Sequence, residues 1–327
     1  MLEFDESFFE GEEREGFFVE AEMKRVWAAQ MEVLVEIDRI CQKYNIQWYA
    51  DYGTLLGAVR HKGFIPWDDD MDISMKREGY MRFMKVVKEE LPKGWFCLSP
   101  QLERTWKQPF MRVVNTERFN MKQEHLQHFH GCPYPVGIDI FPIDCLPENQ
   151  AELDMLKILY QDTLYIKELI KNEIEKEDKE IVKQIVEEKE KRIAELEEWL
   201  NFKVDRDGDV VNQMLCMSER LAALYTEEEC SGLGVWCFMK VGKPDRIREK
   251  AWYEEAVPLP FENIMIPAPK GYDGVLRSDY GDYMTPVRGE AAHDYPFYKK
   301  YKNQVQEWAE NVKTLNQRLS NLEENVL

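Results

Sequence analysis

The chain has 327 residues, 44% of them hydrophobic, which is enough for one large domain with an elaboration or for two smaller domains of mixed α and β structure. A formal net charge of −19 disfavours a generic nucleic-acid binder, because such a surface repels phosphate backbones and anionic lipid headgroups. Seven cysteines without a CxxC pair give little support to a structural zinc site. No apolar run approaches the roughly 20 residues that span a bilayer. We therefore expect a soluble, cytoplasmic protein without a signal peptide.

The first half of the chain alternates between helical and extended patterns. Apolar residues at helical intervals predict a long amphipathic helix over residues 21–44. The pattern then predicts, in chain order, a short strand near 46–49, a turn and short helix over 51–63, a strand over 70–75, a helix over 77–91, and strands over 110–115 and 137–141. This order favours a small mixed sheet with helices packed on it, so the expected fold class is α+β.

The second half differs in composition. Residues 168–198 are dense in Glu and Lys, with Ile and Leu at helical intervals, which predicts a charged helical hairpin broken near 176–179. The elements expected after it are a linker at 205–209, a helix over 212–225, a loop-rich stretch over 257–296 that lines a site, and an amphipathic helix over 300–321. The predicted parts are an acidic N-terminal segment (1–24), a catalytic core (25–148), a charged helical insertion (149–204) and a C-terminal helical and loop-rich part completing the cleft (205–327).

The most informative segment is the acidic run after Pro66. Side chains two apart on a strand point the same way, so Asp70 and Asp72 are expected on one face, and Asp68 shares their parity. Adjacent carboxylates repel each other unless a cation lies between them, and oxygen ligands suit Mg²⁺ or Mn²⁺. The spacing therefore predicts a metal site; the alternative is an exposed acidic turn that binds no metal.

Three neighbouring features favour the metal site. Gly53 and Thr54 open the short helix and offer backbone N–H groups and a hydroxyl to a phosphate. Asp139 stands between two Ile residues in a predicted strand, where a third metal ligand would account for a carboxylate. The cations that would offset phosphate charge are Arg60, Lys62 and Arg112.

Three blocks of the sequence resemble the LicD family, which includes fukutin and fukutin-related protein. The first begins at Trp48 as WYADYGTLLGAVRH and continues at Phe64 as FIPWDDDMD, ending at Asp72. The second is GIDIFPID at 137–144, and the third is YGDYMTP at 280–286, with His293 downstream. The likeness covers about residues 25–145 and 257–295.

The resemblance implies a nucleotidyltransferase fold of the polymerase β type. It also implies transfer of a phosphorylated alcohol, above all phosphocholine, from a CDP-linked donor to a cell-surface glycan such as lipopolysaccharide or to teichoic acid, with release of CMP. By position, Gly53 and Thr54 match the Gly-Ser or Gly-Thr motif of the fold, Asp70 and Asp72 match its metal-binding pair, and Asp139 is assigned as the third carboxylate.

The expected site joins a metal centre to a donor-binding surface. The expected catalytic residues are Asp70, Asp72 and Asp139, and the same three with Asp68 are the expected ligands of Mg²⁺ or Mn²⁺. The expected substrate-binding residues are Gly53, Thr54, Arg60, His61, Lys62, Trp67, Arg112, Arg288 and His293. The expected partners are a CDP-alcohol donor and a glycan acceptor. If the acceptor is linked to a membrane, the protein would meet it at the inner face of that membrane.

Several readings stay open from the sequence. A nucleotidylyltransferase that releases pyrophosphate, and a binding protein that has kept the fold without catalysis, are the alternative functions. Aromatic residues offered for a quaternary ammonium group are Trp48, Tyr49, Trp67, Trp106, Tyr134 and Tyr280. The histidines at 125, 128 and 130 are either a zinc site or a solvent-facing group, and the oligomeric state is undetermined.

Overall fold

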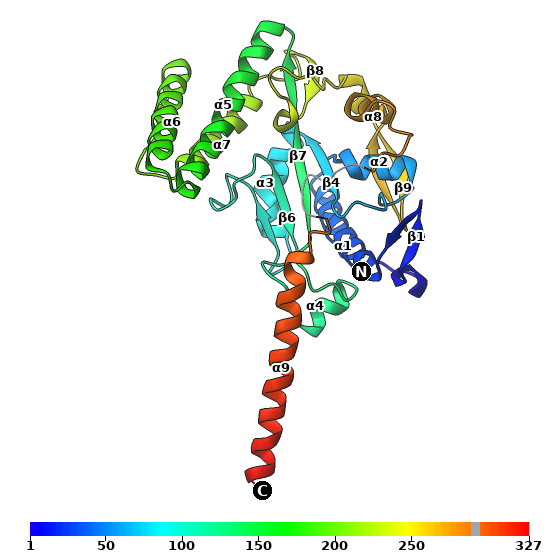
Figure 1. Ribbon diagram of the computed structural model, residues 1–327. Coiled ribbons are helices and arrows are strands. Elements are labelled where there is room, and N and C mark those ends of the chain that lie inside the picture. Colours follow the sequence, from blue (N-terminus) through cyan, green and yellow to red (C-terminus); the bar gives the residue numbers. More distant parts are fainter. Residues whose placement is uncertain (289–294, 327) are drawn as a thin grey trace.

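The centre of the molecule is a mixed β-sheet. A computed structural model describes the backbone of residues 1–288 and 295–326, with side chains to residue 318. In this part of the chain the sheet has six strands in the order β3-β4-β7-β6-β5, and β8 pairs with the far half of β7 (Figure 1). Only β4 and β7 run parallel among these described strands. The strands are β3 (Tyr49–Ala50), β4 (Asp72–Lys76), β5 (Phe96–Leu98), β6 (Met111–Val114), β7 (Gly137–Pro147) and β8 (Cys230–Gly234).

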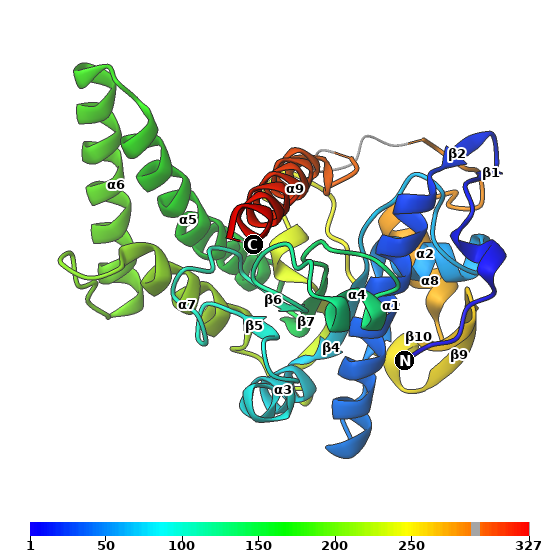
Figure 2. The same ribbon diagram turned by 90° about the horizontal axis from the view of Figure 1, so that it is seen from below.

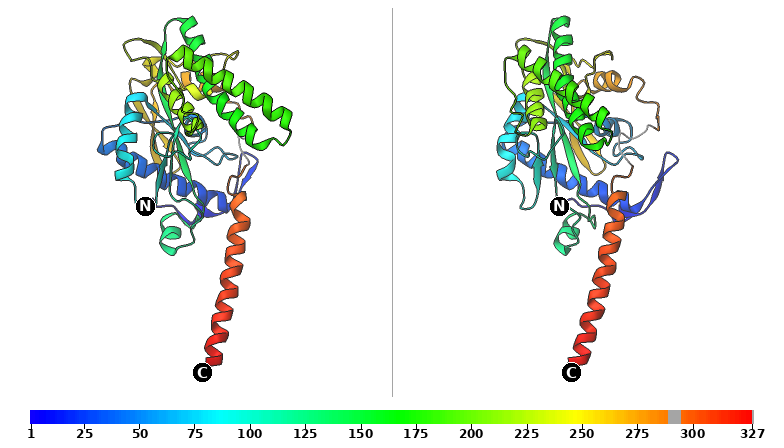
Figure 3. Two further views of the ribbon diagram at one scale, coloured as in Figure 1. Left: turned by 90° about the vertical axis from the view of Figure 1, so that its left-hand side faces the viewer. Right: turned by 60° about the vertical axis from the view of Figure 1, so that its left-hand side comes forward.

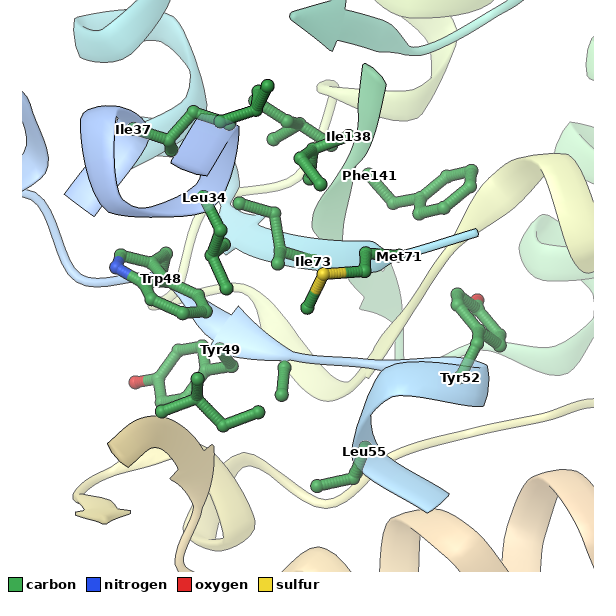
Figure 4. Packing of buried hydrophobic residues seen from close by; sticks show 14 of the residues in the cluster. Leu34, Ile37, Trp48, Tyr49, Tyr52, Leu55, Met71, Ile73, Ile138 and Phe141 are labelled. Carbon is green, nitrogen blue, oxygen red and sulfur yellow. The ribbon is translucent and has the colours of Figure 1, made fainter. Parts of the chain in front are cut away.

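One face of the sheet is buried under two helices. Helices α1 (Ala21–Lys43) and α3 (Arg77–Glu90) contact each other and β7. Figure 4 shows Leu34 of α1 close to Ile73 of β4. Since strand residues alternate between faces, the neighbours Asp72 and Asp139 point to the opposite face, away from α1.

That opposite face borders the C-terminal part of the chain. Helix α2 (Tyr52–Arg60) contacts β4, α8 (Tyr272–Tyr280) and a two-stranded hairpin of β9 (Ala256–Phe261) and β10 (Ile264–Pro269). The β9–β10 hairpin and α8 therefore border α2 (Figure 2). The smaller elements are η1 (Glu6–Phe9), β1 (Glu12–Arg14), β2 (Phe17–Val19), α4 (Gln123–His128), η2 (Trp236–Phe238) and η3 (Lys250–Tyr253).

A helical insertion forms a second core. Helices α5 (Gln150–Glu175), α6 (Lys179–Leu200) and α7 (Val210–Ala222) pack together beside the sheet (Figure 1). Arg77 at the start of α3 ties them to the sheet, because it donates hydrogen bonds to Asp144 of β7 and to Glu219 of α7. Helix α9 (Lys299–Val326) leaves the body near the start of α1, where Lys302 pairs with Glu22, and extends outward as a single long helix (Figures 1 and 3).

The structure confirms the α+β class and most predicted elements, with two exceptions. The stretch predicted as loop-rich contains the β9–β10 hairpin and α8; its prolines are tolerated because a two-stranded hairpin leaves one edge of each strand without a partner. The strand predicted from Asp70 begins only at Asp72, where the Asp51 N–H donates to the Asp72 carbonyl at 3.2 Å. In the described residues, no helix has the length and apolar character needed to cross a membrane.

Candidate metal and phosphate site

Asp72 and Asp139 form the base of the candidate site. They are direct neighbours in the register of the parallel pair β4–β7. The Asp72 N–H donates to the Thr54 hydroxyl at 2.8 Å, and the Asp139 N–H donates to the Met71 carbonyl at 3.2 Å. These backbone bonds hold both carboxylates on the same side of the sheet, next to the first turn of α2.

The acidic run before β4 lies against the same face. One carboxylate oxygen from each of Asp68, Asp69 and Asp70 lies within 4.8 Å of the others. Helix α1 holds the backbone of this segment, because Trp27 donates to the Asp68 carbonyl at 3.0 Å and Gln30 donates to the Asp69 carbonyl at 2.7 Å. The run is therefore a turn held in place by these two hydrogen bonds. It differs from the exposed acidic turn that was the alternative to a metal site.

Electrostatic effects show that the acids share one site. Burial, followed by the charges of Asp70, Asp139 and Asp68, raises the pKa of Asp72 well above its ordinary value. Burial, followed by the charge of Asp70 and a hydrogen bond with it, raises the pKa of Asp68 in the same way. Asp70 was predicted to lie beside Asp72 because strand side chains alternate. The structure places Asp70 before the strand, so this reason is wrong, although Asp70 does lie beside Asp72.

The donor set fits a hard divalent cation. It offers carboxylate oxygens from Asp68, Asp70, Asp72 and Asp139, and such oxygens are the ligands that Mg²⁺ and Mn²⁺ prefer. Asp69 is a poorer ligand, because it is buried and its carboxylate accepts the backbone N–H of Phe297 at 2.6 Å. A bound cation would relieve the repulsion that raises the pKa of Asp72.

Arg112 faces this acidic face from the adjacent strand. It is the register neighbour of Asp139, and its guanidinium donates to both carboxylate oxygens, with Nη2 at 2.6 Å from Oδ2. Burial opposes the charge on Arg112, but the attraction of Asp139, Asp70 and Asp72 raises its pKa. The structure therefore brings the predicted cation Arg112 to the carboxylates.

The first turn of α2 closes the site on another side. Asp51 caps the helix by accepting the Tyr52 N–H at 2.9 Å. Gly53 permits close approach, because a Cβ there would lie 2.6 Å from Oδ2 of Asp68. The Thr54 hydroxyl oxygen accepts the Asp72 N–H, so its own O–H and the backbone N–H groups of this turn are the donors predicted for a phosphate.

The other predicted cations lie at the far end of α2, about 12 Å along the helix from Gly53. Arg60 donates to the Tyr283 carbonyl at 2.7 Å, and His61 Nδ1 lies 3.0 Å from a Glu15 carboxylate oxygen. Burial lowers the pKa of His61. Lys62 is exposed, and its carbonyl accepts the Glu262 N–H at 2.8 Å.

Trp67 and Arg288 form a rim near this end of α2. The Arg288 guanidinium lies 5.6 Å from the centre of the Trp67 ring and donates to the carbonyls of Glu15 and Gly16 at 3.0 and 2.7 Å. His293, predicted as a substrate contact, lies outside the described residues. The structure thus separates the predicted phosphate ligands into an inner set around Arg112 and an outer set around Arg60 and Arg288.

A buried network around Arg248 was missed by the sequence analysis. Arg248 is 1% exposed and donates to both oxygens of Asp51, at 2.6 and 2.9 Å, and to Asp279 at 2.9 Å. It also lies 5.2 Å from the ring centre of Tyr52 and donates to the Tyr253 hydroxyl at 2.8 Å. Because Asp51 caps α2, this network orients the helix turn that faces the acids; the only sequence signal was an aspartate immediately before the helix.

The histidines near residue 128 do not form a metal site. In the described part of the chain, none of these histidines belongs to a group of three metal-ligating side chains within 4.8 Å of one another, as Asp68, Asp69 and Asp70 do. His130 instead lies 2.8 Å from a Glu32 oxygen, and burial lowers the pKa of His125 to about 4. These contacts are structural, so the zinc reading loses its support.

A mixed sheet that presents neighbouring aspartates beside a Gly-Thr helix turn defines a nucleotidyltransferase-type domain. Residues 45–143, from just before β3 into β7, match the family described as LicD/FKTN/FKRP, nucleotidyltransferase domain. This match supports the resemblance that the sequence motifs indicate.

The similarity extends beyond that domain in one relative. The Haemophilus influenzae protein named lipopolysaccharide cholinephosphotransferase LicD is 24% identical over 258 residues, which cover 78% of this chain and 88% of that protein. An uncharacterized protein of Rickettsia typhi is 38% identical over 64 residues, 20% of this chain and 21% of its own length. A Rickettsia prowazekii protein is 36% identical over 58 residues, 18% of this chain and 22% of its own.

Proposed function

We propose that the protein is a metal-dependent phosphotransferase that moves phosphocholine from CDP-choline to a cell-surface glycan and releases CMP. The observation that carries this proposal is the convergence of Asp68, Asp70, Asp72 and Asp139 on one face, where burial and then the neighbouring carboxylate charges raise the pKa of Asp72. The cholinephosphotransferase of Haemophilus influenzae, similar over most of both chains, supports phosphocholine as the transferred group and a glycan as the acceptor.

The chain's own residues suggest how the transfer proceeds. Held by the four aspartates, Mg²⁺ or Mn²⁺ would neutralise the diphosphate and stabilise charge on the leaving oxygen. Arg112 orients the donor, because its guanidinium stays in place beside Asp139 while its raised pKa keeps it charged. A carboxylate oxygen can accept more than one bond, so the pairing of Asp139 with Arg112 is compatible with a ligand role.

In the reaction itself, a glycan hydroxyl attacks the phosphorus that carries choline. The new phosphorus–oxygen bond forms in line as the bond to the CMP oxygen breaks, and the hydroxyl proton passes to a carboxylate of the site or to water. The backbone N–H groups in the first turn of α2 bind the departing phosphate. The outer residues Arg60, Trp67 and Arg288 are assigned to the acceptor or to the nucleotide end of the donor.

Product analysis tests this function directly. The protein would be incubated with Mg²⁺ and each of CDP-choline, CDP-ethanolamine, CDP-glycerol and CDP-ribitol, and nucleotide products would be separated by chromatography. We expect CMP from CDP-choline, slowly by hydrolysis without an acceptor and faster with a suitable glycan. Pyrophosphate release from a nucleoside triphosphate and an alcohol would instead establish the nucleotidylyltransferase, and absence of Mg²⁺ binding would establish the non-catalytic alternative.

Choline recognition requires aromatic faces, and the structure changes which residues supply them. Trp48, Tyr49 and Tyr134 are buried in the core (Figure 4 shows the first two), so we favour a group that includes an exposed ring. Phe141 lies two residues from Asp139 on the same face of β7. The rings gathered around Phe141 are Phe110 at 4.8 Å and Phe238 at 5.3 Å, with Tyr52 at 4.6 Å from Phe238 and Trp106 at 5.8 Å from Phe110.

We assign this aromatic group to the trimethylammonium of choline, and Phe238 provides the test. Its side chain is 38% exposed, so Phe238→Leu removes the ring with little loss of core volume. We expect the KM for CDP-choline to rise about tenfold, the effect of a lost cation–π contact, with an unchanged KM for CDP-glycerol. Phe96→Leu, at a 40% exposed phenylalanine on β5, is the matched control. An equal rise with both donors would argue against the assignment.

A further inference from the structure

Helix α9 presents a regular apolar seam. Tyr301, Val305, Trp308, Val312 and Leu315 follow one another at alternating spacings of four and three residues, which is a heptad repeat. In the sequence, Leu319, Leu322 and Val326 continue the same spacing. Every other residue from 302 to 318 is polar except Ala309. The seam therefore occupies only the a and d positions of the heptad.

Among the side chains that the structure describes, those at the base of this helix pack on the body. Tyr301 and Val305 pack against the main core, and Lys302 forms an ion pair with Glu22 at 2.8 Å. Farther along, α9 runs clear of the sheet and the helical insertion (Figures 1 and 3). The side chains of Trp308 and Leu315 are 40% and 56% exposed. A single helix about 40 Å long with such a seam is only marginally stable unless the seam is covered.

We propose that the seam of α9 binds the same seam of a second copy of this chain, as a parallel two-stranded coiled coil. Beyond the part packed on the body, Val312 occupies an a position and Leu315 a d position, and β-branched residues at a with leucine at d favour two parallel strands. A parallel pair also places both bodies at the same end of the coil. An antiparallel pair would direct the tip of each helix at the partner's body.

The polar positions agree with this occupant. In a parallel pair, position g of one helix faces position e of the next heptad on the other, which matches Gln304 with Ala309 and Asn311 with Asn316. No like charges meet at these positions. A membrane surface is a poorer occupant, because helices that lie on lipid carry a wide apolar face, whereas Glu307 and Glu310 border the narrow stripe.

Sedimentation velocity on the full chain tests the proposal, and its outcome is independent of the proposed enzyme activity. At about 50 µM we expect the wild-type protein to have the mass of a dimer. The double variant Val312→Asp/Leu315→Asp should be a monomer with unchanged melting of the body. Its matched control, Thr314→Asp/Gln317→Asp, adds the same number of acids outside the seam and should remain a dimer.

Cross-linking tests the orientation of the two helices. In a parallel coil, position 315 faces its own copy, so Leu315→Cys should form an intermolecular disulfide on mild oxidation, whereas Gln317→Cys should not. A wild-type monomer at 50 µM, dissociation of the control variant, or flotation of a monomer with anionic phosphatidylserine vesicles would overturn the proposal. Equal cross-linking at both positions would overturn the parallel arrangement.

Discussion

Replacing Asp72 by Asn is expected to reduce CMP release from CDP-choline at least about a thousandfold without unfolding the protein. The substitution removes one metal-binding carboxylate next to Asp139, and a loss of about 4 kcal/mol of transition-state stabilisation corresponds to that factor. Asp70→Asn should behave similarly. Initial rates at saturating Mg²⁺ measure the effect, and Asp207→Asn, at an exposed acid before α7, is the charge-matched control. Activity above a tenth of the wild-type rate would exclude Asp72 from the metal site.

Thermal melting of the same variant gives a readout that does not depend on the donor. The folded-state pKa of Asp72 is raised, so its contribution to stability is fully present below the ordinary carboxyl pKa and is lost as pH rises through the raised value. Without metal, Asp72→Asn should therefore melt above the wild type at pH 8, and the difference should shrink on acidification. Mg²⁺ should stabilise the wild type more than the variant. A variant that melts lower than the wild type at pH 8 without metal would contradict the repulsion described for Asp72.

Replacing Arg248 by Met is expected to lower the free energy of unfolding by about 3–5 kcal/mol and the melting temperature by about 10 °C. The cause is that Asp51 and Asp279 would be left buried without their counter-ion. Urea or thermal unfolding measures the effect. Arg246→Met is the matched control. The Arg246 side chain is 45% exposed, and its guanidinium is 3.9 Å from Asp279, which is too far for a hydrogen bond. Its loss should lower the free energy of unfolding by less than about 1 kcal/mol.

A double variant separates the buried pair from simple loss of packing. If Asp51 without Arg248 is the main source of instability, Asp51→Asn in the Arg248→Met background should restore part of the lost free energy. Additive losses in the two single variants would show instead that packing around Tyr52 dominates. Equal destabilisation by Arg246→Met and Arg248→Met would contradict the buried network altogether.

Local patterns in the sequence predicted the acidic face better than they predicted its surroundings. The run after Pro66 and the lone Asp139 between isoleucines pointed to one site, because each pattern is set by a few adjacent residues. The Arg248–Asp51 pair joins residues 197 positions apart, and no local pattern indicates it. The hairpin of β9 and β10 was not predicted because its prolines have low strand propensity. That propensity does not take into account that proline is tolerated at a strand edge without a partner.

The eleven-residue strand β7 connects the candidate site to the helical insertion. It pairs with β4 and β6 along its first part and with β8 along its last, so a slip by one residue would break three ladders together. Residues 139–147 of β7 span about 27 Å, so the strand fixes the distance from Asp139 to the end of β7, three residues before α5 begins. The fixed length of β7 therefore keeps the helical insertion at a constant distance from Asp139.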